Sequence, residues 1–259
     1  MIDLSSSIFD KSENSTRNSD IPPRTGIIEK VGIREMLESL DSPVESLSLG
    51  NFDFIGEFTA KKQRSSDSDL FHSVGAFFRP NYERGLLIYS LIKKYDINSY
   101  LEIGWGRGYS CLCAAMAMTE KGSGTVTTID PNLDEKQIQS LSAVLPKEWF
   151  ENIKFYQSTS DKFFDEVKET YDMIYIDGDH RYEAVKNDWK NASERSNKIV
   201  LFDDYHLPGK EQKDMEVSSL VDSITDHDKK LIIMDRRIFF DDRRYPDEDI
   251  DYGQVLIVK

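Results

Sequence analysis

The chain contains very little cysteine. Cys111 and Cys113 are the only two cysteines among 259 residues, and they lie two positions apart in an apolar stretch with helical spacing. On a helix this spacing directs the two side chains to different sides, and it is too close for an unstrained disulfide or a metal clip. We therefore expect a reducing, cytoplasmic compartment.

The sequence also lacks long apolar runs and an excess of positive charge. No apolar segment approaches the roughly 18 residues that a membrane-spanning helix needs, and residues 1–20 have neither the basic region nor the apolar region of a signal peptide. Lys and Arg total 33 against 47 Asp and Glu, for a formal net charge of −14. Because this charge repels phosphate backbones and anionic lipids, we expect a small-molecule substrate and neither nucleic acid nor membrane as a partner.

The pattern of the chain changes near residue 81. Residues 1–20 are rich in Ser, Asn and Asp without a period, which predicts a mobile tail, and residues 27–40 have the spacing of a short amphipathic helix. We expect residues 1–80 to form an N-terminal extension or lid over a domain formed by residues 81–259.

Within residues 81–259, short apolar strands alternate with helices. The five strand-like runs are SYLEIG, TVTTID, NIKFYQ, YDMIYID and KIVLFDD, and two further runs, KLIIMDRRIFF and DYGQVLIVK, flank one acidic loop. A connection that short and free of helix suits antiparallel strands. The sequence therefore predicts an α/β fold: a Rossmann-like sheet of seven strands, five parallel plus a terminal antiparallel pair, with helices on both faces.

A glycine-rich loop, LEIGWGRGYS, lies where the first of these strands meets its helix. Gly104, Gly106 and Gly108 let the backbone turn sharply and approach a ligand, with a helix N-terminus behind it. The NAD fingerprint GxGxxG would place its third glycine at position 109, which is Tyr109. The pattern here is E-x-G-x-G-x-G, beginning at Glu102.

An acid follows the second strand at Asp130. A carboxylate at this place accepts both hydroxyls of a ribose, because its two oxygens have the matching spacing. NAD enzymes use the same position, so Asp130 indicates an adenosine without choosing the cofactor. Taken together with the glycine loop, Glu102 and Asp130 are better explained as cofactor contacts than as solvated strand ends.

The E-x-G-x-G-x-G motif resembles the first motif of class I S-adenosylmethionine (SAM)-dependent methyltransferases. Residues 81–259 also follow that family's order of elements. The resemblance implies that the glycine loop wraps the amino-acid part of SAM and that Ser158–Ser160 lie where the family contacts adenine, although these three residues equally suit a helix N-cap. The expected cofactor contacts are Glu102, Gly104, Gly106, Gly108, Tyr109, Ser110, Asp130, Ser158, Thr159, Ser160 and Asp177.

Carboxylates cluster after the fourth and fifth strands, in IDGDHRYE and LFDDYH. Parallel neighbours would bring Asp177, Asp203 and Asp204 to within about 5 Å of one another on the edge that carries the glycine loop. Two unit charges at about 5 Å repel by roughly 3 kcal/mol at an effective dielectric of 20. The cluster needs a cation, raised pKa values or hydrogen-bond donors, and Mg²⁺ or Mn²⁺ with oxygen ligands is one solution.

These two segments look like those of macrocin-type and mycinamicin-type sugar O-methyltransferases, a metal-dependent group. The resemblance places Asp177, Asp203 and Asp204 at metal-ligand positions, and it places Asp179 and His180 where relatives draw their general base. It leaves the choice between Asp179 and His180 open. It implies a SAM-dependent O-methyltransferase of class EC 2.1.1 that acts on a hydroxyl of a sugar, polyketide or catechol-like molecule, and it favours a homo-oligomer.

Other interpretations remain beside this one. Asp179 and Asp204 also suit helix or loop caps that bind no metal. Cephalosporin-hydroxylase-like oxidoreductases share a similar core and acidic site, and a non-catalytic SAM-binding protein would share the glycine loop. His206 is a candidate substrate contact, and Trp105 is expected either to cover the cofactor or to pack against the N-terminal section.

Overall fold

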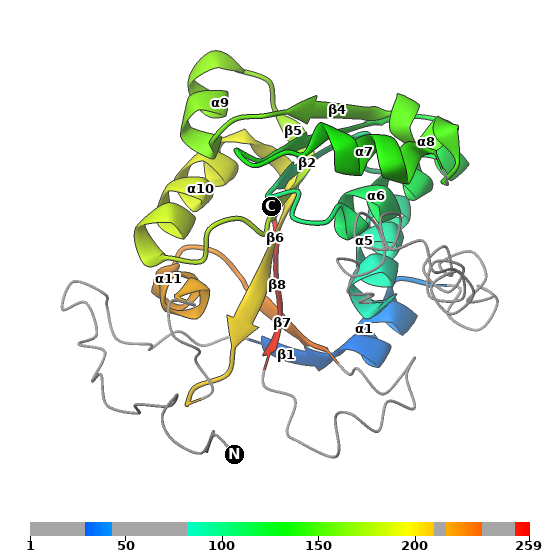
Figure 1. Cartoon of the computed structure of the whole chain (residues 1–259). Helices are drawn as coiled ribbons and strands as arrows, with labels where there is room; N and C mark the ends of the chain where they lie inside the picture. Colours follow the sequence, from blue (N-terminus) through cyan, green and yellow to red (C-terminus); the bar gives the residue numbers. More distant parts are fainter. Residues whose placement is uncertain (1–28, 43–81, 144, 210–215, 235–251) are drawn as a thin grey trace, which may run out of the picture.

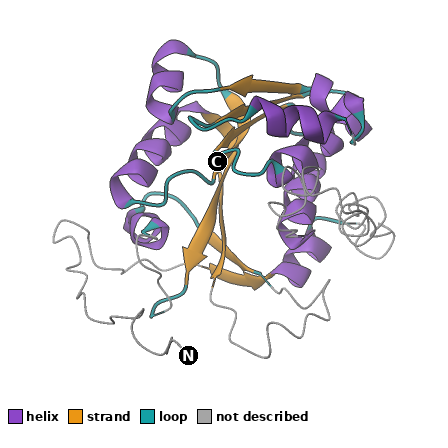
Figure 2. Cartoon of the chain, viewed as in Figure 1, coloured by secondary structure: helices purple, strands orange, loops and turns teal. Residues whose placement is uncertain are grey.

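The computed structural model describes residues 29–42, 82–143, 145–209, 216–234 and 252–259. These residues form one mixed sheet with helices on both faces (Figures 1 and 2). The predicted tail at residues 1–20 and the part of the predicted lid at residues 43–80 lie outside the described residues. None of the helices described is long and apolar enough to cross a membrane.

The sheet has the strand order β1-β7-β8-β6-β5-β2-β3-β4. Its strands are β1 (Glu29–Gly32), β2 (Ser99–Ile103), β3 (Thr125–Ile129), β4 (Ile153–Tyr156), β5 (Tyr171–Ile176), β6 (Ser196–His206), β7 (Lys230–Ile233) and β8 (Tyr252–Val258). β8 runs antiparallel to both of its neighbours, β6 and β7, and the remaining pairings are parallel. This confirms the predicted Rossmann-like sheet with a terminal antiparallel pair.

The described residues contribute eight strands, where the sequence predicted seven. The additional strand is β1, and the helix predicted over residues 27–40 is wrong for Glu29–Gly32. β1 pairs in parallel with β7 at the edge of the sheet, and its mostly exposed residues lack the apolar alternation that indicates a strand. Helix α1 (Ile33–Ser39) follows and buries Ile33, Met36 and Leu37, so this part of the predicted extension packs into the core.

Helices cover the two faces of the sheet in separate groups (Figure 1). One face carries α1, α5 (Tyr82–Lys94), α6 (Tyr109–Lys121), α7 (Glu135–Ser142) and α8 (Lys147–Glu151). The other carries α9 (Ser160–Glu166), α10 (Tyr182–Arg195) and α11 (Val217–Ser223). Cys111 and Cys113 are free and lie in the central helix α6, which is buried from Tyr109 to Met118.

The direction of the helical connections changes at the centre of the sheet. β2 lies between β3 and β5, and the helices that follow β2 and β5 pack on opposite faces. In open parallel sheets, ligands bind outside the carboxyl ends of the strands at such a switch point. The glycine loop after β2 and the acidic segment after β5 both lie at this position.

Candidate functional site

The register of the sheet brings the predicted site residues to one edge. The last paired residues of four neighbouring strands stand in one row, and they are Ile129, Ile103, Ile176 and Phe202. The residues that follow them in the chain are Asp130, Gly104, Asp177 and Asp203. The glycine loop and three acids therefore lie at the same level of the sheet.

The glycine loop lies directly against the segment after β5. Gly104 has a φ of 96°, and a Cβ at this position would stand 2.1 Å from the backbone oxygen of Asp177. Only glycine fits there, because both the backbone conformation and the available space exclude a side chain. This close approach joins the predicted cofactor loop to the first acid of the cluster.

Trp105 packs within the domain. Its indole Nε1 donates to Oε1 of Gln137 on α7 at 3.0 Å, and its ring meets Phe155 of β4 edge to face. The side chain is 2% exposed. Trp105 therefore anchors the glycine loop to α7 and β4, which neither of the two alternatives from the sequence anticipated.

Asp130 holds the glycine loop in place. Its Oδ2 accepts the backbone N–H of Trp105 at 3.0 Å and of Gly106 at 3.1 Å, while Oδ1 accepts the N–H of Asn132 at 2.7 Å. The carboxylate predicted to bind ribose is thus adjacent to the loop predicted to bind the amino-acid part of SAM.

Glu102 lies beneath this loop, in the core. It is fully buried, and its Oε2 accepts the hydroxyl of Tyr100 at 2.8 Å. Burial raises the pKa of Glu102 to about 8, although the Tyr100 hydroxyl acts in the opposite direction. Tyr109 and Ser110, in the first turn of α6, are also buried. All three residues next to the glycine loop in the sequence are therefore buried.

The hydroxyl groups after β4 have partners within the protein. Thr159 caps α9 by accepting the N–H of Lys162, which confirms the N-cap alternative for this segment. Ser160 donates to Oδ1 of Asp188 on α10, and Ser158 donates to the backbone oxygen of Thr159. Their contact with adenine stays a prediction.

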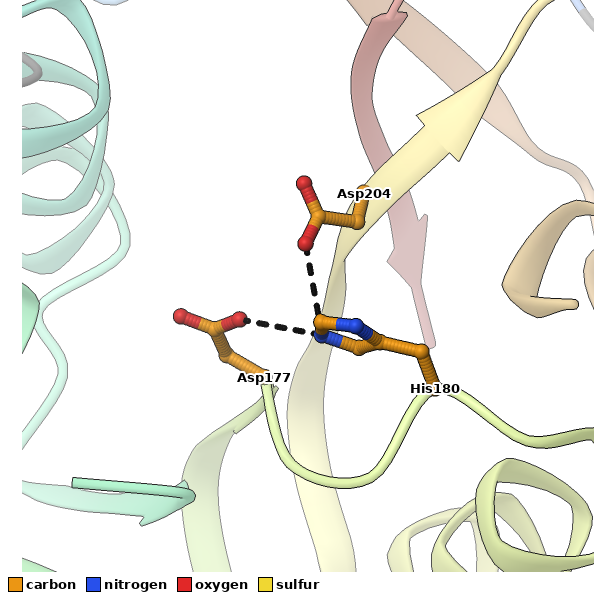
Figure 3. Close-up of side chains that lie close together, drawn as sticks. All are labelled: Asp177, His180 and Asp204. Atoms are coloured by element: carbon orange, nitrogen blue, oxygen red, sulfur yellow. Dashed lines mark ion pairs between the residues drawn. The ribbon is translucent and has the colours of Figure 1, made fainter. Parts of the chain in front are cut away.

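His180 lies between two carboxylates (Figure 3). Its Nε2 is 3.3 Å from Oδ2 of Asp204 and 3.9 Å from Oδ1 of Asp177. Each of the three residues offers one ligand atom, and these atoms lie within 4.8 Å of one another. Two carboxylate oxygens and an imidazole nitrogen at this spacing fit a divalent cation.

Asp203 and Asp204 are consecutive but face different surroundings. Asp204 has a φ of 52°, and the pairing of β6 with β8 shifts register between Phe202 and Tyr205. Such a bulge redirects side chains along a strand, and Asp adopts this left-handed conformation more readily than most residues. The side chain of Asp204 is 25% exposed beside His180, whereas that of Asp203 is 1% exposed.

Asp203 is held by two residues that the sequence did not single out. Nη1 of Arg84, on α5, lies 2.6 Å from Oδ2 of Asp203 and 3.0 Å from Oδ2 of Asp177. Nε2 of Gln254, on β8, donates to Oδ1 of Asp203 at 3.1 Å and to the hydroxyl of Tyr175 at 3.1 Å. The positive charge of Arg84 and the hydrogen bond from Gln254 therefore partly offset the predicted repulsion within the acidic cluster.

The electrostatics of the cluster follow from its burial and its crowded charges. Burial, reinforced by Asp203, raises the pKa of Asp177, and burial with the charges of Asp203 and Asp177 raises that of Asp204 to about 7. The carboxylate of Asp177 raises the pKa of His180 above the ordinary 6.5. Both changes indicate a site with a surplus of negative charge.

Asp179 points to a different partner. Its carboxylate accepts from Nε of Arg181 at 3.0 and 2.9 Å and also from the backbone N–H of Arg181. Arg181 lowers the pKa of Asp179. Of the two candidate bases, only His180 lies among the clustered acids.

His206 ends β6 as a buried side chain, and its backbone N–H donates to Oγ of Ser218 on α11. Gln254 had a signal in the sequence, because a single amide inside the apolar run QVLIV indicates a buried polar contact. Arg84 had none, because nothing in its own helix points to partners far along the chain.

Comparison with known proteins agrees with this geometry. The family described as "Methyltransferase domain" matches residues 101–205, the segment from β2 to Tyr205 in β6. The described core has the Rossmann-like fold of class I SAM-dependent methyltransferases. No curated protein matches the sequence significantly.

Solved structures share the methyltransferase fold at low identity. The O-methyltransferase TomG from Streptomyces achromogenes, solved with SAM, is 16% identical, with a TM-score of 0.54 over 75% of this chain and 90% of that one. A putative caffeoyl-CoA O-methyltransferase from Staphylococcus aureus is 18% identical, with a TM-score of 0.50 over 80% and 99%. The cofactor-bound protein Rv0187 from MTB is 14% identical, with a TM-score of 0.57 over 85% and 95%.

Proposed function

We propose that this methyltransferase transfers the methyl group of SAM to a hydroxyl oxygen of a small molecule. The observation that carries the proposal is the position of His180, between Asp177 and Asp204 at the carboxyl edge that also holds the glycine loop. Hydroxyl methylation requires a group that takes the hydroxyl proton beside the methyl donor. The O-methyltransferase names of two structural neighbours agree with this choice.

SAM would lie across the loops after β2, β3 and β4. Gly104, Gly106 and Gly108 permit the close backbone approach, and Asp130 keeps the loop in its turned conformation. A ribose that reaches Asp130 would share this carboxylate with the loop N–H groups. We propose the predicted set from Glu102 to Ser110, with Asp130, Ser158–Ser160 and Asp177, as the lining of this cofactor site.

We further propose that a Mg²⁺-class or Mn²⁺ ion binds between Asp177 and Asp204. Mg²⁺ is often held by one or two carboxylates and completes its coordination with water and substrate oxygens. The cluster contains three carboxylates, one guanidinium and one imidazole. When all three acids are ionised and the imidazole is neutral, the cluster has a surplus of two negative charges, which matches a divalent cation. When bound, such an ion orients a pair of substrate oxygens and lowers the pKa of a coordinated hydroxyl.

His180 performs the proton transfer in this scheme. Its Nε2 takes the hydroxyl proton while the substrate oxygen bonds to the methyl carbon and the carbon–sulfur bond breaks, with its electron pair left on sulfur. Asp177 and Asp204 position the imidazole ring, because both carboxylates lie beside Nε2. The side chain is 31% exposed, so the proton passes to solvent afterwards.

Methyl transfer from labelled SAM tests the proposal directly. A catechol and a vicinal sugar diol serve as acceptors, each assayed with Mg²⁺, with excess EDTA, and with EDTA followed by Mn²⁺. We expect labelled ether that disappears with EDTA and returns with Mn²⁺. Transfer that persists in EDTA would remove the ion from the proposal and leave His180 as base.

The same assay separates the competing classes of function. A cephalosporin-hydroxylase-like oxidoreductase would consume an oxidant and leave the label on SAM, and a non-catalytic protein would bind SAM without forming an ether. Calorimetry with SAM and NAD(H) accompanies it. Tighter binding of NAD(H) than of SAM would exclude the methyltransferase function.

A further inference from the structure

A buried polar network connects the acidic cluster to two elements outside the matched methyltransferase region of residues 101–205. Arg84 on α5 and Gln254 on β8 approach Asp203 at different oxygens, Arg84 at Oδ2 and Gln254 at Oδ1. Gln254 is fully buried, and the Asp203 side chain is 1% exposed. Gln254 therefore hydrogen-bonds one oxygen of Asp203, and Arg84 forms an ion pair with the other, buried oxygen without a hydrogen bond to it.

The other two acids differ from Asp203 in this respect. The side chains of Asp177 and Asp204 are 20% and 25% exposed, and each directs one oxygen toward His180. Arg84 reaches Asp177 as well, but only at Oδ2, which leaves Oδ1 on the side of His180. Removing one partner of a buried pair of guanidinium and carboxylate is strongly destabilising, because the other charge is left without compensation.

We propose that Arg84 and Asp203 form a fixed, charge-neutral pair, so that Asp203 is not a ligand of the divalent ion and Arg84 limits how tightly Asp177 and Asp204 bind it. The inference rests on the proposed function, and it departs from the resemblance, which implies Asp203 as a ligand. Arg84 acts here as a positioning residue. Its charge repels a cation at Oδ1 of Asp177 over a short and partly buried distance, where salt screens little.

A double-mutant cycle on Mn²⁺ binding tests this pair. The full-length chain is titrated with Mn²⁺ alone, and the free ion is followed by electron paramagnetic resonance. Asp203→Asn should weaken binding about 10-fold, because the charge of Arg84 is left uncompensated, and Arg84→Met should strengthen it about 10-fold. The double variant should return to within about 3-fold of the wild type, because a neutral pair has been removed as a whole.

The same cycle contains the results that would overturn the inference. If Asp203 is a ligand, the loss of its coordinating oxygen exceeds the gain from removing Arg84, and the double variant stays about 10-fold or more weaker than the wild type. Weaker binding by Arg84→Met would equally contradict the role of Arg84. Thermal melting checks the fold of each variant, and Arg84→Gln with Asp203→Asn is a second neutral pair that keeps hydrogen-bonding groups if Met is not tolerated.

Failure of the inference can be distinguished from failure of the proposed function. Binding in the wild type without rescue in the double variant overturns the inference alone. Binding in Arg84→Met but not in the wild type supports the inference and removes the ion from the proposed function. Absence of Mn²⁺ binding in all variants overturns the inference and removes the ion from the proposed function, while the transfer of labelled methyl still tests the methyltransferase activity.

Discussion

The indole of Trp105 lies over the α-carbon of Gly108, so closely that a Cβ on Gly108 would stand 2.3 Å from the ring. Gly108 also has a φ of 82° as the N-cap of α6. The glycine loop is therefore locked between a large side chain and a helix start. This relationship gives the first prediction.

Gly108→Ala should destabilise the fold by about 2–4 kcal/mol, because the methyl group adds overpacking to backbone strain. Gly122→Ala is the matched control, since Gly122 has a φ of 75° at the other end of α6 but nothing within 4 Å of its Cβ position. The control should lose only about 1–2 kcal/mol, from strain alone. Urea denaturation measures both, and equal losses would contradict the packing argument.

Asp130→Ala should weaken SAM binding by about 1–3 kcal/mol, because a charged acceptor of loop and ribose hydrogen bonds is lost. Asp134→Ala is the control: Asp134 caps α7 by accepting the N–H of Lys136, close in sequence but outside the loop. It should cost about 1 kcal/mol of stability and leave SAM affinity unchanged. Calorimetry that finds the same affinity loss in both variants would argue against a cofactor role for Asp130.

Asp188→Asn should make stability less dependent on pH. Burial raises the pKa of Asp188 from 3.8 to about 7, so the unfolded chain releases this proton at a lower pH than the folded protein does. The wild type therefore loses stability as pH rises from about 4 to about 7, and the loss persists above that range. The Asn variant mimics the neutral acid and should be more stable by about 1–3 kcal/mol near pH 8, with little difference near pH 4.

The control for Asp188 is Asp165→Asn, an exposed acid on the neighbouring helix α9. This substitution should change stability by less than about 0.5 kcal/mol at either pH. Guanidinium denaturation near both pH values supplies the comparison. A gain for Asp188→Asn that is as large at pH 4 as at pH 8 would show that it does not arise from ionisation.

His180→Ala should lower kcat by about 100-fold or more and leave SAM affinity nearly unchanged, because the lost group is the proton acceptor. Asp179→Ala should change kcat by less than about 10-fold, since Arg181 lowers the pKa of Asp179 and so makes it a poorer base. A base must be neutral, so kcat should rise with pH as His180 loses its proton. A larger loss in Asp179→Ala would reverse the assignment.

Much of the fold was predictable because its signals are local. The parallel strands β2 to β6 contain short apolar runs, and the helices between them have clear periods. β1 could not be predicted in this way, since its four residues, EKVG, become a strand only through pairing with β7. Because the partner strand lies far along the chain, the segment itself contains no pattern that indicates the pairing.

The site was predictable at the level of strand ends and not at the level of side chains. Aligned strand ends gather Asp177 and Asp203, as the sequence predicted. The left-handed backbone of Asp204, however, separates it from Asp203 and turns it to His180. The pairing of Asp203 with Arg84 depends on how α5 packs across the sheet, and no residue near Arg84 encodes that.

The position of β8 affects how the chain can fold as it is synthesised. Strands β2 to β6 pair with one another directly, whereas β1 and β7 join them only through β8. Residues 29–32 therefore leave the ribosome long before residues 252–258 provide the strand that connects them to the sheet. Until then the nascent protein carries an open edge on β6, with the apolar run from Ile199 to Phe202 exposed to pairing with other chains.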